Sequence, residues 1–142
     1  MPAAPEAPHQ DEFPPLEALS ILVVEDDVNS RTLVTNLLKR RGHSVVVARD
    51  GTEALELHAA DPADLILMDI QMPNLGGLEA AAAIRKSEAL SGRRTPIVAL
   101  TAHALEGDRE RCLRAGMDDF VSKPIRPADL FQKIALLRTV RE

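Results

Sequence analysis

The chain has 142 residues, which is enough for one domain with a single core. Hydrophobic residues make up 45%, charged residues 27% and aromatic residues 2%, with no Trp or Tyr and a net charge of −5. The scarcity of aromatic rings excludes the stacking platforms that bind single-stranded nucleic acid, and no basic residues cluster into a patch. We therefore expect no nucleic-acid partner.

The start of the chain differs from the rest. Residues 1–15 hold five of the ten prolines, and such a segment buries too little apolar surface to order itself. We expect residues 1–18 to form a disordered, Pro-rich linker or tail and residues 19–142 to form the domain. No apolar run reaches the length of a membrane span, and no signal peptide is recognisable, so we expect a cytoplasmic protein without membrane contact.

Five short apolar runs, rich in β-branched residues, are typical of strands buried on both faces. They lie at residues 21–24, 44–48, 65–68, 96–100 and 119–122. The segments between them have helical patterns. The first, from Val28 to Arg41, carries an apolar stripe and is followed by Gly42 as a stop signal. The apolar residues that mark the helices are Leu33, Val34, Leu37 and Leu38, then Leu55, then Leu78, Ala82 and Ile84, then Leu105, Cys112 and Leu113, then Leu130, Ile134 and Leu137.

Alternation of buried strands with helices predicts an α/β fold whose parallel sheet is covered on both faces. Five strands and five helices favour the flavodoxin-like doubly wound order 2-1-3-4-5. In such folds ligands bind at the carboxyl ends of the strands, where the strand order reverses. That edge is where we look for chemistry.

Polar residues follow the predicted strands at this edge. They are Glu25, Asp26 and Asp27 after the first strand, Asp69 after the third, Thr101 and Ala102 after the fourth, and Lys123 and Pro124 after the fifth. Two carboxylates about 4 Å apart repel by roughly 4 kcal/mol at an effective dielectric constant near 20, so a cluster of acids favours a cation. Oxygen ligands suit Mg²⁺. Asp27 is better interpreted as the cap of the following helix.

Taken singly, these residues have ordinary explanations. Asp69 would start a turn, Lys123 would be a solvated loop lysine, and Thr101 would be a strand-end threonine. Their joint placement at successive strand ends indicates a site for a phosphoryl group on Asp69, because such a group would need the charge of Lys123 and a metal ion together, and Thr101 offers it a hydroxyl donor.

The chain resembles the receiver domains of two-component response regulators over residues 20–140. The matching stretches are Ile21 to Asp27, Leu67 to Pro73, Ala99 to Ala102, and Ser122 to Pro124. The resemblance implies that Asp69 is the phosphoacceptor. It also implies Mg²⁺, with Mn²⁺ as a substitute, bound by Asp26, Asp69 and the backbone carbonyl of Gln71, with Glu25 acting through water.

The resemblance further implies how the phosphoryl group is held and sensed. Lys123 would pair with it, Thr101 and Ala102 would bind it, and Thr101 with Phe120 would form the switch pair. Family members often have Tyr at the position of Phe120. The bond between Lys123 and Pro124 is typically cis in this family.

Two positions depart from the family pattern. Gly76 stands where Asp is commoner, which should loosen the turn before the third helix. His103 stands where the family tunes hydrolysis of the phosphoryl group, and either a titrating shield or an inert surface histidine fits there.

The resemblance implies a signalling switch rather than an enzyme, with removal of its own phosphoryl group as the one activity left open. Its partners would be a histidine kinase or a histidine phosphotransfer protein, and a downstream protein that reads the surface of helix 4, strand 5 and helix 5. An interaction-only module would lack one of the strand-end residues, and none is missing. A phosphatase would need a second acid where Gln71 stands, and a flavin protein would need aromatic contacts.

Two settings for the domain stay open: a stand-alone regulator, and the terminal receiver of a hybrid histidine kinase. The Pro-rich start and the stretch from Thr101 to Ile125 favour the hybrid kinase.

Overall fold

The computed structural model describes residues 18–72, 74–102 and 106–141. The predicted disorder of the N-terminal tail and the role of His103 therefore lie outside the described residues. The strands are β1 (Ser20–Val24), β2 (Ser44–Ala48), β3 (Leu65–Asp69), β4 (Ile97–Thr101) and β5 (Asp119–Ser122). The helices are α1 (Val28–Arg40), α2 (Gly51–Ala60), α3 (Gly77–Ser91), α4 (Glu106–Arg114) and α5 (Pro127–Arg141).

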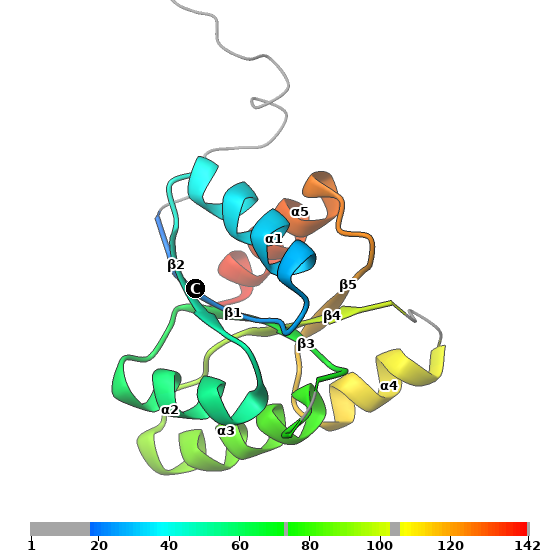
Figure 1. Cartoon of the computed structure of the whole chain (residues 1–142). Helices are drawn as coiled ribbons and strands as arrows, with labels where there is room; N and C mark the ends of the chain where they lie inside the picture. Colours follow the sequence, from blue (N-terminus) through cyan, green and yellow to red (C-terminus); the bar gives the residue numbers. More distant parts are fainter. Residues whose placement is uncertain (1–17, 73, 103–105, 142) are drawn as a thin grey trace, which may run out of the picture.

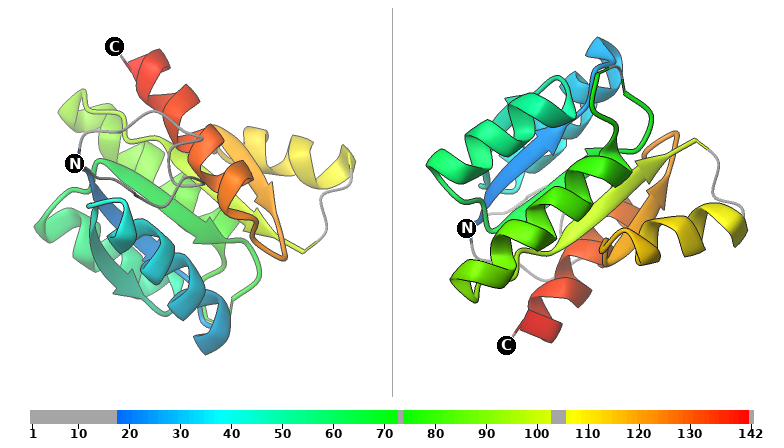
Figure 2. Two further views of the ribbon diagram at one scale, coloured as in Figure 1. Left: turned by 90° about the horizontal axis from the view of Figure 1, so that it is seen from above. Right: turned by 90° about the horizontal axis from the view of Figure 1, so that it is seen from below.

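The strands form one parallel sheet in the order β2-β1-β3-β4-β5. This confirms the predicted flavodoxin-like architecture. Figure 1 shows α1 and α5 on one face of the sheet and α2, α3 and α4 on the other, and Figure 2 shows the same three layers from above and below. The sheet order reverses between β1 and β3, so the carboxyl ends of these two strands lie side by side.

Two apolar clusters, one on each face, hold the helices to the sheet. On the first face, Val34 and Leu38 of α1 and Leu130 and Ile134 of α5 pack on β1, β3 and β4. On the second face, small residues of α2 and α3, such as Ala54, pack on the same strands. Because the central strands are apolar throughout, both faces exclude water from the backbone of the sheet.

The prediction that β2 is buried on both faces was wrong. Only Ala48 of this strand is buried, and Val46 is 45% exposed, because β2 lies at the edge of the sheet where helices cover it incompletely. The same prediction was wrong for β5 at the opposite edge, where only Val121 is buried. Leu33 and Leu113 were also placed on apolar helix stripes but are exposed. In α1 the buried stripe runs through Val34, Leu37 and Leu38.

Helix caps define how the chain leaves the strands at the carboxyl edge. Asp27 caps α1 by accepting a hydrogen bond from Ser30 N at 2.8 Å, which confirms its predicted capping role. Asp50 caps α2 in the same way, whereas Gly76 at the start of α3 makes no side-chain cap. Within the described ranges, no helix combines the length and apolarity required to cross a bilayer.

Candidate functional site at the carboxyl edge of the sheet

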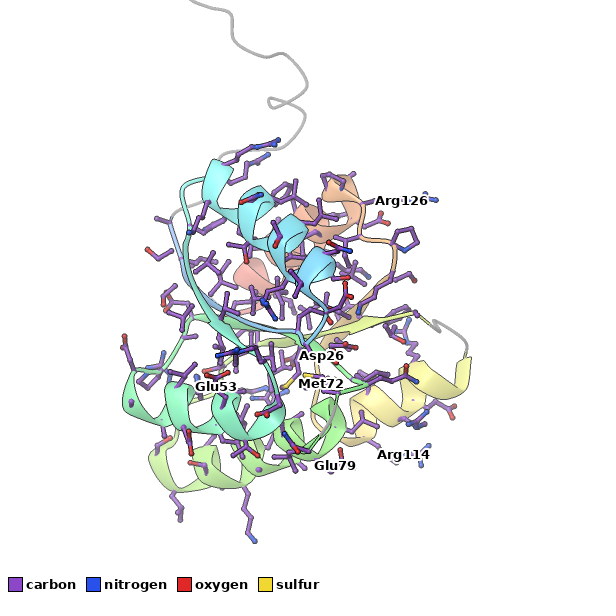
Figure 3. The ribbon with its side chains drawn as sticks, viewed as in Figure 1. Asp26, Glu53, Met72, Glu79, Arg114 and Arg126 are labelled. Carbon is purple, nitrogen blue, oxygen red and sulfur yellow. The ribbon has the colours of Figure 1, made fainter. Side chains whose placement is uncertain are left out.

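Three carboxylates converge where β1 and β3 end. Oxygens of Glu25, Asp26 and Asp69 all lie within 4.8 Å of one another. They converge because β1 and β3 pair directly, with Val24 opposite Met68. In Figure 3, Asp26 and Met72, which follows Asp69 by three residues, lie at this edge of the sheet. Asp26 is exposed, whereas Glu25 and Asp69 are buried.

Lys123 brings positive charge to the cluster from the end of β5. Its Nζ atom lies 2.8 Å from Glu25 Oε1 and 3.3 Å from Asp69 Oδ2. β5 is separated from β3 by β4, and the long lysine side chain spans that distance. The structure thus joins two of the predicted carboxylates through the predicted lysine.

Burial makes the charges of this cluster unequal. Burial of Glu25, together with its contact with the Asp69 carboxyl group, raises the pKa of Glu25 to about 7, although Lys123 opposes the shift. Burial alone would lower the pKa of Lys123, but its contacts with Glu25 and Asp69 raise it above the ordinary value. One ammonium group therefore serves more than one carboxylate, and the three carboxyl groups of the cluster outnumber this single nearby cation.

The donor set fits a hard divalent cation. The three side chains offer carboxylate oxygens at different exposures, with Asp26 open to water. Glu25 Oε1 has its ion pair with Lys123 but no hydrogen bond of good geometry among the described residues. Mg²⁺ prefers one or two carboxylates, keeps several waters and shares phosphate oxygens, so an exposed Asp26 beside a buried Asp69 suits it.

Glu25 has hydrogen-bond partners on both its side chain and its backbone. Its Oε2 atom accepts a hydrogen bond from Asp27 N at 3.2 Å, and its backbone carbonyl accepts one from Arg31 Nη1 at 3.1 Å. Sequence reasoning missed both the ion pair with Lys123 and the contact with Arg31. No local pattern signals them, because each depends on how the chain folds back at the sheet edge.

The loop after β3 keeps Asp69 in place. Gln71 N donates to Asp69 Oδ1 at 3.1 Å, so the two oxygens of Asp69 face different partners: Gln71 on one side and Lys123 on the other. Gln71 itself is exposed. Its backbone carbonyl, the predicted metal ligand, belongs to the same short turn.

Thr101 and Ala102 stand at the end of β4, next to β3. Thr101 is 2% exposed and Ala102 is exposed. The carbonyl of Thr101 accepts a hydrogen bond from Lys123 N at 2.7 Å, which ties the ends of β4 and β5 together. The peptide bond between Lys123 and Pro124 is cis.

Phe120 lies apart from the acidic cluster. It is half-buried on β5 beside a cavity of about 50 Å³ that Arg109 and Cys112 of α4 also line. Its ring faces Arg109 at 5.9 Å and Lys133 of α5 at 5.7 Å from the ring centre. The structure therefore divides the predicted residues into a compact charged group and a separate aromatic residue between α4 and α5.

Comparison with known proteins agrees with this geometry. The family model of the response regulator receiver domain matches residues 21–135. The polar-differentiation response regulator DivK of Brucella ovis is 40% identical over 106 residues, which cover 75% of this chain and 85% of DivK. Other curated relatives are histidine kinases and sensor proteins, and the chain spans only 7 to 15% of their length.

Two solved structures are similar in fold and sequence. The receiver domain of sensor histidine kinase PA1611 from Pseudomonas aeruginosa, with a magnesium ion in its active-site cleft, is 43% identical with a TM-score of 0.74 over 83% of this chain and 94% of that one. The receiver domain of Ssk1 from Saccharomyces cerevisiae, crystallised with the histidine phosphotransfer protein Ypd1, is 34% identical with a TM-score of 0.78 over 82% of this chain and 86% of that one. With its strand order, its strand-end carboxylates and a family model that covers most of its length, this chain belongs to the response regulator receiver domain family.

Proposed function

We propose that Asp69 accepts a phosphoryl group from a phosphohistidine on a histidine kinase or a histidine phosphotransfer protein. The observation that carries this proposal is the Lys123 ammonium, which lies between Glu25 and Asp69 at the edge of a three-carboxylate cluster. A buried acid, a neighbouring cation and a set of metal ligands are the parts that phosphoryl transfer requires.

The residues of the chain position the reacting groups. An oxygen of Asp69 attacks phosphorus, a new P–O bond forms, and the P–N bond to the donor histidine breaks. The imidazole leaves with the bonding electron pair and recovers its proton from water. Gln71 N orients one oxygen of Asp69, and Lys123 neutralises charge near the other. Asp26, Asp69 and the Gln71 carbonyl, with Glu25 acting through water, would hold Mg²⁺ or Mn²⁺, and the bound ion would neutralise charge on the phosphoryl oxygens.

The phosphoryl group then changes the partners of the residues around it. Lys123 exchanges its contact with Asp69 for a phosphoryl oxygen, and Thr101 and Ala102 contact the same group from the end of β4. As Thr101 moves, Phe120 leaves its place between Arg109 and Lys133 and packs inward. The surface of α4, β5 and α5 changes as a result and regulates a downstream protein.

The domain acts in a phosphorelay as the receiver of a hybrid histidine kinase on the cytoplasmic side. The long curated relatives and the similarity to the receiver domain of PA1611 support this setting. The similarity to DivK, most of whose length the chain covers, supports the second candidate, a stand-alone regulator. The phosphoryl chemistry is the same in both.

Intact mass spectrometry after incubation with acetyl phosphate tests the proposal. We expect the wild-type chain to gain one phosphoryl group with Mg²⁺ and none with EDTA, and Asp69→Asn to gain none. Asp61→Asn, which changes an exposed acid at the far end of α2, is the matched control and should behave as the wild type. Phosphorylation of Asp69→Asn to the wild-type level would contradict the assignment.

A further inference from the structure

The loop between β3 and α3 carries the Gln71 carbonyl and is tied to a helix that has no other part in the site. This β3–α3 loop comprises residues 70–76, and Pro73 lies outside the described residues. Asn74 Nδ2 donates a hydrogen bond to Asp50 Oδ2 at 2.9 Å, across 24 residues of sequence. Because a carboxylate only accepts hydrogen bonds, this contact fixes which end of the Asn74 amide faces Asp50.

A second contact runs beside the first. Gly51 N donates to the Leu75 carbonyl at 3.0 Å. The backbones approach so closely that a Cβ atom on Gly51 would lie 2.5 Å from the Leu75 oxygen. The first residues of α2 and the outer part of the β3–α3 loop are therefore fitted to each other through both side-chain and backbone atoms.

Asp50 is well suited to hold Asn74. It is the N-cap of α2, and its other oxygen accepts a hydrogen bond from Glu53 N at 2.9 Å. The hydrogen bonds from the Glu53 backbone and from Asn74 lower the pKa of Asp50, so the acceptor stays ionised at neutral pH. Each carboxylate oxygen has its own donor, and the rigid start of a helix anchors both.

Apart from the apolar contacts of Ile70, Met72 and Leu75 with the core, the outer part of the loop has weak hydrogen bonds at its end. Gly76, the N-cap of α3, makes no side-chain cap, and Gly77 N reaches the Ile70 carbonyl only at 3.4 Å. Asn74 has a φ of +66°, a left-handed conformation that Asn and Gly tolerate better than most residues.

We propose that Asp50 and Asn74 are positioning residues that hold the β3–α3 loop in the conformation in which the Gln71 carbonyl binds the divalent cation. The inference rests on the proposed metal-dependent function. Without the tether the loop samples more conformations, and the fraction competent to bind the cation falls, which weakens the apparent affinity.

Isothermal titration of the full chain with Mg²⁺, well below the unfolding temperature, tests the inference. Asn74→Gly keeps the left-handed backbone and removes the hydrogen bond, and we expect the Kd for Mg²⁺ to rise about 3- to 10-fold. The double variant Asp50→Asn/Asn74→Asp exchanges donor and acceptor, keeps the net charge and retains a good N-cap. Its Kd should return to within about twofold of the wild-type value.

The outcomes separate the two proposals. A merely structural contact would lower the unfolding temperature in EDTA without changing the Kd, and that result would overturn the positioning role alone. A failure of the exchanged pair to restore the Kd would do the same. If the wild-type chain bound Mg²⁺ no better than Asp26→Asn does, the proposed metal site itself would fail, and the positioning role with it.

Discussion

The two sides of the site are packed very differently. On the β3–α3 side, a Cβ atom on Gly77 would lie 2.3 Å from the Asp69 carbonyl oxygen, and α3 buries several side chains against the sheet. On the α4 side, a Cβ atom on Gly107 would meet nothing within 4 Å. Cys112 is the buried residue of α4 within the part of the helix whose side chains are described.

This difference in packing separates the β3–α3 side, which would carry out the phosphoryl chemistry, from the α4 side, which would change position in response to it. Under the proposed function, Asp69 and the β3–α3 loop would have to keep their positions for a metal ion and a phosphoryl group, and close packing at Gly77 holds them there. Among the described side chains of α4 only Cys112 is buried, so we expect a small change in the site to be enough to shift this helix. Lys123 connects the two sides, because it directly follows β5, which contacts α4, and it contacts the carboxylates of Glu25 and Asp69 at the ends of β1 and β3.

The largest effect should follow from breaking that connection. In Lys123→Met the charge near Asp69 is lost, and we expect the rate of phosphorylation by acetyl phosphate to fall about 10- to 100-fold, as for a charge-assisted contact worth about 1.5–3 kcal/mol. Time-resolved intact mass measures this rate. Lys123→Arg keeps a positive charge, so its phosphorylation rate should fall less. An equal fall in rate in both variants would argue against an electrostatic role of Lys123.

A pair of glycine substitutions probes the packing itself. Gly77→Ala should destabilise the fold by about 1–3 kcal/mol, because the new methyl group meets the backbone of Asp69 and Ile70. Gly107→Ala meets open space and should stabilise α4 by about 0.5–1 kcal/mol. Urea denaturation followed by circular dichroism measures both. Equal changes in the free energy of unfolding for the two substitutions would contradict the difference in packing between the β3–α3 side and the α4 side.

The smallest expected effect is on the pH dependence of stability, and it comes from His58 near the start of β3. His58 Nδ1 accepts a hydrogen bond from Ala63 N at 3.1 Å, just before β3, and burial lowers the pKa of His58 below its usual value. The stability that neutral His58 contributes is therefore full above about pH 6.5 and is lost as the pH falls through the lowered value. Thermal unfolding of wild type and His58→Gln from pH 8 to pH 5 should show wild type losing more stability, whereas a constant difference would exclude this contribution.

The strand-end residues and the fold were predictable because they follow from patterns within short stretches. Apolar runs alternating with helical stripes give a parallel sheet, and its carboxyl edge collects Asp26, Asp69 and Lys123. The exposure of β2 does not follow from its run of valines alone, because it depends on the place of the strand at the sheet edge. The predicted order 2-1-3-4-5 gave that place, but the prediction of burial did not use it. The ion pair of Glu25 with Lys123 was missed for a similar reason, since its partners meet only through the tertiary fold.

The sequence indicates only one of the two hydrogen bonds that Asp50 makes, the one that caps α2, and gives no sign of the one with Asn74. Asp50 followed by Gly, Thr and Glu53 is a helix start, and it indicates the cap but not a second partner. The departure at Gly76 predicted a loosened turn, and the structure shows a hydrogen bond from the same loop to Asp50 two residues earlier, at Asn74.

Amide hydrogen exchange with and without phosphorylation tests the central claim most directly, which is that the β3–α3 side holds the phosphoryl group and the α4 side responds to it. The account predicts altered exchange in peptides from residues 106–122 of the phosphorylated wild-type chain, little change in β1 and β3, and no change in Asp69→Asn treated in the same way. Changes confined to β1 and β3, with α4 and β5 unaffected, would contradict it.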